Sequence, residues 1–84
     1  MQSLRTKTTS VREKDIEIIY NLIFRNALYS FECIRVGGNE EAKDYCFVED
    51  FTDDEGEAEL FLKRMTRGRV FPVHIKEIAE DFFH

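Results

Sequence analysis

The sequence predicts an α+β fold, in which a three-stranded antiparallel β-meander is followed by two α-helices packed on one face (β-β-β-α-α). Apolar and aromatic residues alternate with period two over much of residues 15–51, and from residue 52 onward they recur at helical spacing. The Gly37-Gly38-Asn39 segment lies between two of the alternating stretches. It predicts a hairpin turn, because Gly and Asn accept positive φ angles.

A length of 84 residues fits one domain. We assign residues 15–84 to a single α+β domain and residues 1–14 to a flexible N-terminal arm, because the arm is polar and rich in Ser and Thr. Two alternatives stay open for the arm. Its Thr-Lys-Thr-Thr stretch could extend as an edge strand beside a partner, or the arm could fold over the outer face of the sheet.

Three segments have the pattern of strands: residues 15–25, 28–36 and 42–51, with a turn at Asn26. The sequence leaves the register of the last hairpin open. One register places Cys33 opposite Cys46, and a shift by one residue separates the thiols. We favour the second register, because it matches Tyr29, Phe31 and Cys33 with Tyr45 and Phe47.

The first predicted helix has a start signal, an apolar stripe and a stop signal. Thr52 and Glu55 have the spacing of a capping box, and Gly68 is placed to end the helix as its C′ residue. The second helix begins at Pro72, whose missing amide hydrogen costs nothing in a first turn. The apolar stripes are Ala58, Phe61, Leu62 and Met65 in the first helix, and Ile75, Ile78, Ala79 and Phe82 in the second.

Charge makes some partners poor candidates. The net charge of −5 opposes binding to nucleic acid or to an anionic membrane. Nucleic-acid binding through Arg64, Arg67 and Arg69 is therefore the third-ranked functional hypothesis. No segment has the apolar core of a signal peptide or the ~18 apolar residues of a membrane span. We expect a cytoplasmic location, in which Cys33 and Cys46 are free thiols.

One polar cluster offers a candidate for chemistry. His74, Glu77 and Asp81 lie at i, i+3 and i+7 on the second helix, and such a set can hold a divalent ion or act as an acid–base pair. A single helix supplies too few ligands for a closed site, and the alternative is a row of solvated side chains. We assign no catalytic residue, no metal ligand and no cofactor.

The apolar residues are too many for one covered face of a sheet. Ile19, Ile23, Leu28 and Ile34 fall on the second faces of the first two predicted strands. Aromatic residues make up 13% of the chain, which adds to the apolar surface that has to be covered. Exposed apolar patches usually mark an interface, so these four residues are the candidate interface, with a second copy of the chain as the expected cover.

The C-terminal half resembles a small bacterial domain family of unknown function. The similarity rests on Val48-Glu49-Asp50-Phe51-Thr52, on Val70-Phe71-Pro72-Val73-His74 and on the closing Glu80-Asp81-Phe82, which match V-x-D-[IF]-[ST], V-x-P-x-H and E-D-F. It covers about residues 16–83, a length typical of a single domain. The resemblance implies a compact domain and brings no known activity or catalytic residue with it.

Together these features predict a cytoplasmic interaction or regulatory module that acts as a homodimer, or binds another protein, without chemistry of its own. The alternative is a metal-dependent or acid–base activity at His74, Glu77 and Asp81.

Overall fold

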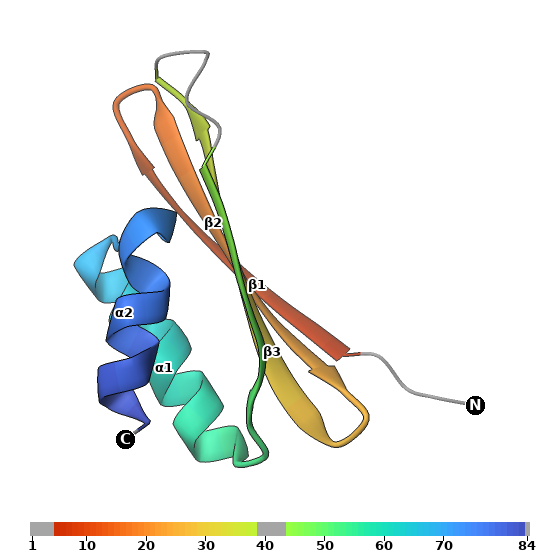
Figure 1. Cartoon of the computed structure of the whole chain (residues 1–84). Coiled ribbons are helices and arrows are strands. Elements are labelled where there is room, and N and C mark those ends of the chain that lie inside the picture. The colour runs from red at the N-terminus through yellow and green to blue at the C-terminus, as the bar shows by residue number, and fades with distance from the viewer. Residues whose placement is uncertain (1–4, 39–43, 84) are drawn as a thin grey trace.

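The computed structural model describes residues 5–38 and 44–83. Four strands form one antiparallel sheet in the order β1-β2-β3-β4, and two helices follow (Figure 1). The elements are β1 (Arg5–Glu13), β2 (Ile16–Arg25), β3 (Leu28–Gly37), β4 (Asp44–Thr52), α1 (Glu55–Gly68) and α2 (Pro72–Phe82). The α+β class and the order of the predicted elements are confirmed.

The prediction of three strands is wrong, because β1 lies in the segment that we assigned to an arm. β1 pairs with β2 along its whole length, from Arg5 opposite Phe24 to Glu13 opposite Ile16. Its polar sequence gave no alternation signal, and the pairing itself supplies partners for its backbone groups. The strand extends the sheet at one edge and does not fold over the outer face.

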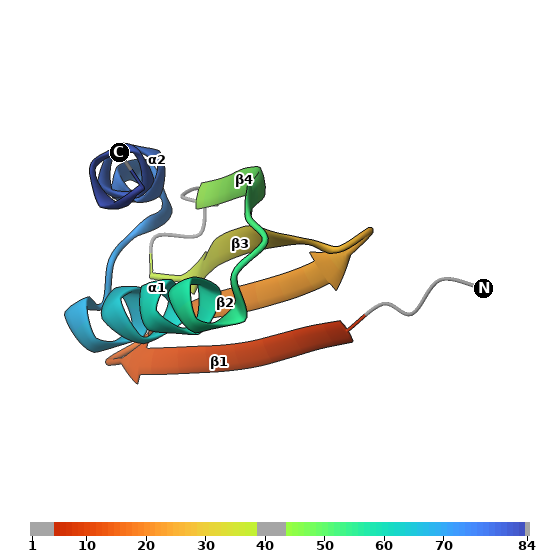
Figure 2. The ribbon, with the colours of Figure 1, turned by 90° about the horizontal axis from the view of Figure 1, so that it is seen from below.

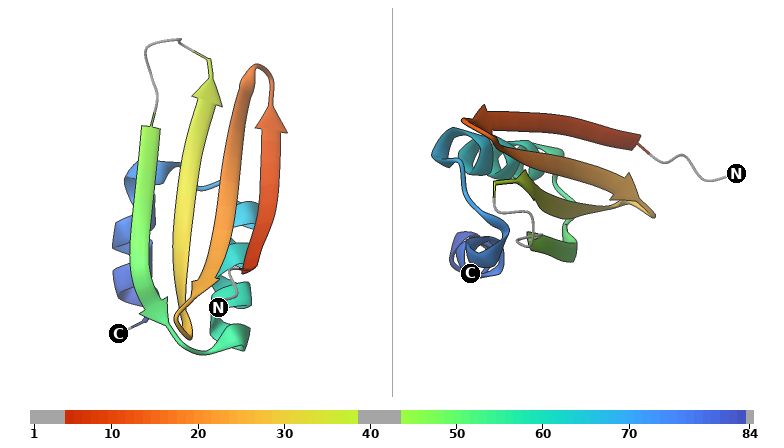
Figure 3. Two further views of the ribbon diagram at one scale, coloured as in Figure 1. Left: turned by 90° about the vertical axis from the view of Figure 1, so that its right-hand side faces the viewer. Right: turned by 90° about the horizontal axis from the view of Figure 1, so that it is seen from above.

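Both helices cover the same face of the sheet, and the opposite face carries no element of the described chain (Figures 2 and 3). The core between the layers holds Tyr20, Phe31, Cys33, Phe61 and Ile75, none of which is exposed. Seven of the eight phenylalanines belong to this core or pack against it, and Phe47 is the exception. The aromatic content is therefore mostly explained by the core.

Tight turns connect the first three strands. Lys14, Asn26 and Ala27 all have positive φ angles, and the Asn26-Ala27 pair forms the two-residue turn expected after β2. Gly37 and Gly38 also have positive φ, as predicted, whereas Asn39 lies outside the described residues. A Cβ atom at Gly37 would collide with the carbonyl oxygen of Asp15, so this position requires glycine.

The register that we favoured for the last hairpin is wrong. Cys33 stands opposite Cys46, and both side chains face the helices. Tyr45 and Phe47 therefore point to the opposite face. The alternation of β4 alone is compatible with either face, and a one-residue shift exchanges them. The packing of Cys46 against the core selects the observed register.

A bulge in β4 brings Phe51 back toward the helices. Tyr29 pairs with Thr52 and Phe31 pairs with Val48, so three residues of β4 stand opposite Ser30. Asp50 has a φ of 48°, and its backbone N–H donates to the Ser30 hydroxyl at 3.0 Å. The Phe51 ring consequently packs against Phe61 of α1, with 5.4 Å between the centroids of the two rings.

The caps of α1 differ from the predicted ones. The N-cap is Asp54, whose carboxylate accepts from the Glu57 N–H at 2.9 Å, and Thr52 instead accepts from the Asp54 N–H at 3.1 Å. The helix ends at Gly68, and the left-handed residue that follows is Arg69, not Gly68. Pro72 begins α2, as predicted.

Candidate functional site

The candidate site is the sheet surface opposite the helices, which we call the open face (Figure 3, left). Alternation along each strand places every second side chain there. Its apolar members are Ile19, Ile23, Leu28, Ile34, Val36, Tyr45 and Phe47. The most exposed of them are Val36 at 40% and Tyr45 at 60%. No helix or strand of the described chain covers these side chains.

A row of hydrogen-bonded polar side chains crosses the open face, and we call it the polar row. The Thr8 hydroxyl donates to Oδ1 of Asn21 at 2.7 Å, and Nδ2 of Asn21 donates to Oε1 of Glu32 at 2.7 Å. The Tyr45 hydroxyl donates to Oε2 of Glu32 at 2.8 Å. One residue from each of the four strands thus takes part, and every member has a partner within the chain.

The hydrogen bond to Glu32 alters the ionisation of Tyr45. A phenol that donates to a carboxylate keeps its proton more firmly, because the phenolate would lose this bond and face a like charge. The bond to Glu32, then burial and the negative charge of Glu32, raise the pKa of the Tyr45 hydroxyl. Tyr45 therefore stays a neutral hydrogen-bond donor in the polar row at ordinary pH.

Aliphatic side chains lie on both sides of the polar row. Ile19 stands opposite Ile34 on one side, and Ile23 stands opposite Ser30 on the other. Ser30 is buried and bonded to Asp50, so it adds no unpaired polar group. Burying a polar group costs free energy mainly when it lacks a hydrogen bond. An apolar partner can therefore cover this face without leaving the polar row unsatisfied.

All four residues of the predicted interface lie on the open face: Ile19, Ile23, Leu28 and Ile34. Whether they bind a partner stays a prediction. Sequence reasoning missed Tyr45 and Phe47 as members of this surface, and it left Val36 out of the predicted interface although Val36 alternates onto the same face as Ile34. The two aromatic residues were assigned to the core by the wrong register, and the only signal for their true side was the alternative register with Cys33 opposite Cys46.

The predicted polar cluster does not form a metal-binding group. His74, Glu77 and Asp81 are exposed on α2. Within residues 5–38 and 44–83, no three His, Cys, Asp or Glu side chains lie close enough to hold a metal ion. The amide of His74 donates to the carbonyl of Phe71 at 3.0 Å, which is a contact of the first helical turn.

The basic residues at the end of α1 and just after it make contacts within the chain. The Arg64 guanidinium lies 5.2 Å from the centroid of the Phe82 ring, and Arg69 pairs with Glu13 at 3.3 Å. Arg67 lies in the last turn of α1, where a positive charge stabilises the helix dipole. Arg64 and Arg69 thus connect α1 to α2 and to β1.

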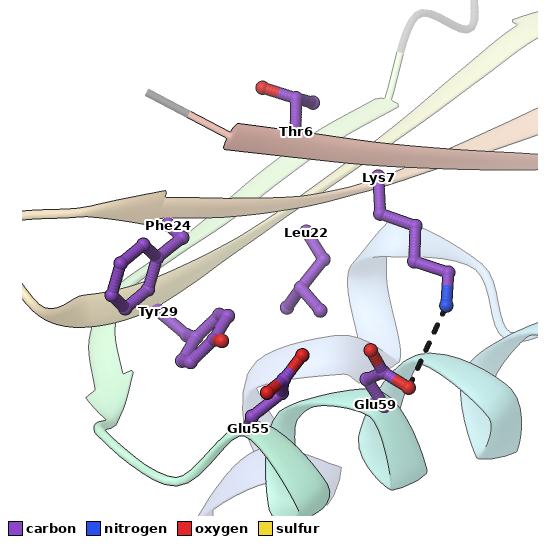
Figure 4. A pocket seen from close by; sticks show the side chains of 7 residues that line it. All are labelled: Thr6, Lys7, Leu22, Phe24, Tyr29, Glu55 and Glu59. Atoms are coloured by element: carbon purple, nitrogen blue, oxygen red, sulfur yellow. Dashed lines mark ion pairs between the residues drawn. The ribbon is translucent and has the colours of Figure 1, made fainter. Parts of the chain in front are cut away.

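A pocket of about 200 Å³ lies between the sheet and the first half of α1 (Figure 4). Its apolar side is formed by Leu22, Phe24 and Tyr29, and the carboxylates of Glu55 and Glu59 project into it from the helix (Figure 4). Lys7 of β1 pairs with Glu59 at 3.7 Å. The described lining residues include no His and no Cys, and no sequence signal indicated this pocket.

The two cysteines are buried, and both are free. Burial, and to a lesser extent the nearby Cys46, raise the pKa of the Cys33 thiol to about 12. Burial also raises the pKa of Cys46, while the positive charge of Lys76 opposes this shift. Both groups are therefore neutral thiols at ordinary pH.

These features define a class of protein: a small α+β domain in which two helices cover one face of a four-stranded sheet and leave the other open. The chain belongs to the family described as Family of unknown function (DUF6514), whose model matches residues 2–84. This confirms the resemblance to a family of unknown function and extends it over β1. No curated protein and no solved structure matches the chain significantly. No helix in the described residues is long and apolar enough to cross a membrane.

Proposed function

We propose that this protein is a non-enzymatic interaction or regulatory module that acts as a homodimer through its open face. One observation carries the proposal. Seven apolar side chains surround a polar row whose members are already hydrogen-bonded to one another. Such a surface gains free energy when a partner removes it from water, and its polar groups keep their partners in the complex.

The size of the face supports a second copy as the partner. Four strands about 4.8 Å apart, each with about nine residues at about 3.4 Å per residue, present a face of about 600 Å². Two such faces bury about 1,200 Å² in total, which is the lower end of the range for specific interfaces. A twofold arrangement needs only this one surface, because each copy offers the same face to the other.

The charge of the face also allows a second copy to bind. The whole chain has a net charge of −5. Alternation places two basic and three acidic residues on the open face, so its formal charge is close to neutral: Arg12, Arg25, Glu17, Glu32 and Glu49. Because the face carries charges of both signs, acidic residues of one copy can lie near Arg12 or Arg25 of the other, which offsets the repulsion between two acidic chains.

We include a cytoplasmic location in the proposal. It is supported by the buried free thiols of Cys33 and Cys46, because thiols persist in a reducing compartment.

The test is the molar mass in solution, measured by light scattering over two orders of magnitude in protein concentration. The wild-type chain is expected to approach twice the monomer mass as concentration rises. Ile19→Glu and Ile34→Glu place charges among the apolar side chains of the open face and are expected to give monomers. Leu60→Glu is the matched control, because Leu60 is 45% exposed on α1, which covers the opposite face of the sheet.

A wild-type chain that stays monomeric at the highest concentration would refute the homodimer. A dimer that Leu60→Glu disrupts and the two isoleucine variants leave intact would place the interface on the helices.

A further inference from the structure

Cys33 and Cys46 stand directly opposite each other on neighbouring antiparallel strands, with both side chains facing the helices. Opposed residues in such a pair have Cα atoms about 4.5–5.5 Å apart. Disulfides span Cα distances of about 4.4–6.8 Å. The backbone of this hairpin therefore holds two free thiols at a separation that a disulfide can bridge without a change of register.

The two thiols differ in their access to solvent. Cys33 is 0% exposed, whereas Cys46 is 7% exposed and lines a hollow of about 410 Å³ beside α2. Pro72, Val73 and Lys76 form the helical side of this hollow. Because β4 is an edge strand, no further strand of the sheet closes the approach to Cys46. Cys46 is therefore the thiol that a small molecule can contact in the folded chain, whereas Cys33 has no exposed surface.

We propose that this pair is a thiol oxidation site, at which a small peroxide converts Cys33 and Cys46 into a cross-strand disulfide. The Cys46 sulfur attacks one peroxide oxygen, the O–O bond breaks, and the products are a sulfenic acid and water. The Cys33 sulfur then attacks the Cys46 sulfur, the S–O bond breaks, and the hydroxide leaves as water with the Cys33 proton. Two thiols and one hydrogen peroxide thus give one disulfide and two waters.

The surroundings of the two thiols fit this order of events. Burial raises the pKa of the Cys46 thiol, and the positive charge of the nearby Lys76 opposes this rise, so Lys76 increases the share of thiolate, which is the reacting form. Cys33 contacts the carbonyl oxygen of Val70 at 3.9 Å, and the Tyr20 hydroxyl donates to the same oxygen at 2.8 Å. When the Cys33 proton leaves, Tyr20 still pairs with this carbonyl, so the cross-link leaves no buried acceptor without a donor.

The experiment treats the native full-length chain with hydrogen peroxide and follows its intact mass. The wild type is expected to lose the mass of two hydrogen atoms as a monomer, and a thiol reductant is expected to restore it. Trypsin cleaves after Arg35 and Lys43, so the cysteines fall in different peptides. Their recovery as one linked, reducible species identifies the bond.

Two single variants test the order of reaction. Cys33→Ser is expected to gain oxygen at Cys46 and form no internal bond. Cys46→Ser is expected to keep Cys33 reduced at the same peroxide dose, because Cys33 itself has no exposed surface. Lys76→Gln leaves both cysteines in place and is expected to slow oxidation several-fold while giving the same product.

The oxidised wild type is also expected to unfold at a higher temperature, by roughly 10 °C, because the bond closes a short loop in the unfolded chain. The proposal is overturned if the native wild type gains only oxygen or stays fully reduced, or if the disulfide forms faster in denaturant than in the folded state. Oxidation of Cys33 in the Cys46→Ser variant would overturn the role of Cys46 as the entry point. None of these outcomes depends on whether the chain forms a dimer.

Discussion

The hydroxyl of Tyr20, on the central strand β2, donates a hydrogen bond of 2.8 Å to the backbone carbonyl of Val70, in the segment between α1 and α2. The two residues are 50 positions apart in the sequence. Tyr20 is fully buried, and burial, followed by the nearby Cys33, raises the pKa of its hydroxyl above the usual range. This neutral donor fixes the connection between the helices against the sheet.

Replacing Tyr20 by Phe removes that donor and keeps the ring. We expect the free energy of unfolding to fall by about 1–2 kcal/mol, because the carbonyl of Val70 stays buried with only the weak Cys33 contact. Urea denaturation followed by circular dichroism measures the change. Tyr45→Phe removes an exposed hydroxyl and serves as the control, with an expected loss well below that of Tyr20→Phe. Equal losses in the two variants would contradict this account.

Alkaline pH is expected to destabilise the protein through its buried thiols. The pKa of Cys33 is about 12 in the folded chain, whereas an unfolded cysteine titrates near about 8.5. The folded state therefore binds more protons in this range, and stability is lost as the pH rises above about 8.5. Through Cys33, the free energy of unfolding is expected to fall by about 1.4 kcal/mol per pH unit once the pH exceeds the pKa of the unfolded thiol.

The measurement is urea denaturation at several pH values between about 8 and 10, with a reductant present. In the Cys33→Ala, Cys46→Ala double variant, the free energy of unfolding is expected to depend much less on pH, as long as the pH stays below the range in which tyrosines titrate. A wild-type stability that is flat over this range would show that the thiols ionise equally in the folded and unfolded states.

The Tyr45 hydroxyl reports on the polar row. Glu32→Gln removes the carboxylate that accepts the bond from Tyr45, so we expect the pKa of Tyr45 to move down toward about 10. Tyrosinate absorbance in a pH titration measures this shift, and the difference from the Tyr45→Phe variant isolates the signal of Tyr45. Thr8→Ala, at the other end of the row, is the matched control. If Tyr45 titrated with the same midpoint in Glu32→Gln as in the wild type, the hydrogen bond between Tyr45 and Glu32 would be contradicted.

The start of α1 depends on Asp54. Asp54→Ala removes the carboxylate that accepts from the Glu57 N–H, and we expect a loss of about 1 kcal/mol in the free energy of unfolding. Glu55→Ala, one residue later, removes only a favourable charge at the helix N-terminus and is expected to cost a few tenths of a kcal/mol. Denaturation measures both losses. If Glu55→Ala cost more free energy of unfolding than Asp54→Ala, the result would favour the Thr52–Glu55 capping box that we predicted from sequence.

Local sequence signals predicted most of the elements correctly, because each signal acts within a few residues. Pro72 begins α2, Asn26 lies in the turn after β2, and the stripe Ala58, Phe61, Leu62 and Met65 is the buried side of α1. Cap positions were less accurate. Asp54 and Thr52 can both cap a helix, and the end of β4 at Thr52 leaves Asp54 in the capping position.

Local sequence patterns were enough to predict the α+β class, the order of the predicted elements and the apolar surplus on the second faces of β2 and β3. Contacts between distant parts of the chain decide that Arg5–Glu13 forms a fourth strand, that Cys33 lies opposite Cys46, and that Tyr45 and Phe47 join the open face. Strand pairing supplies hydrogen-bond partners to a polar segment that has no periodic signal of its own. Period-two alternation leaves the choice of face to the contacts of the whole sheet with the helices.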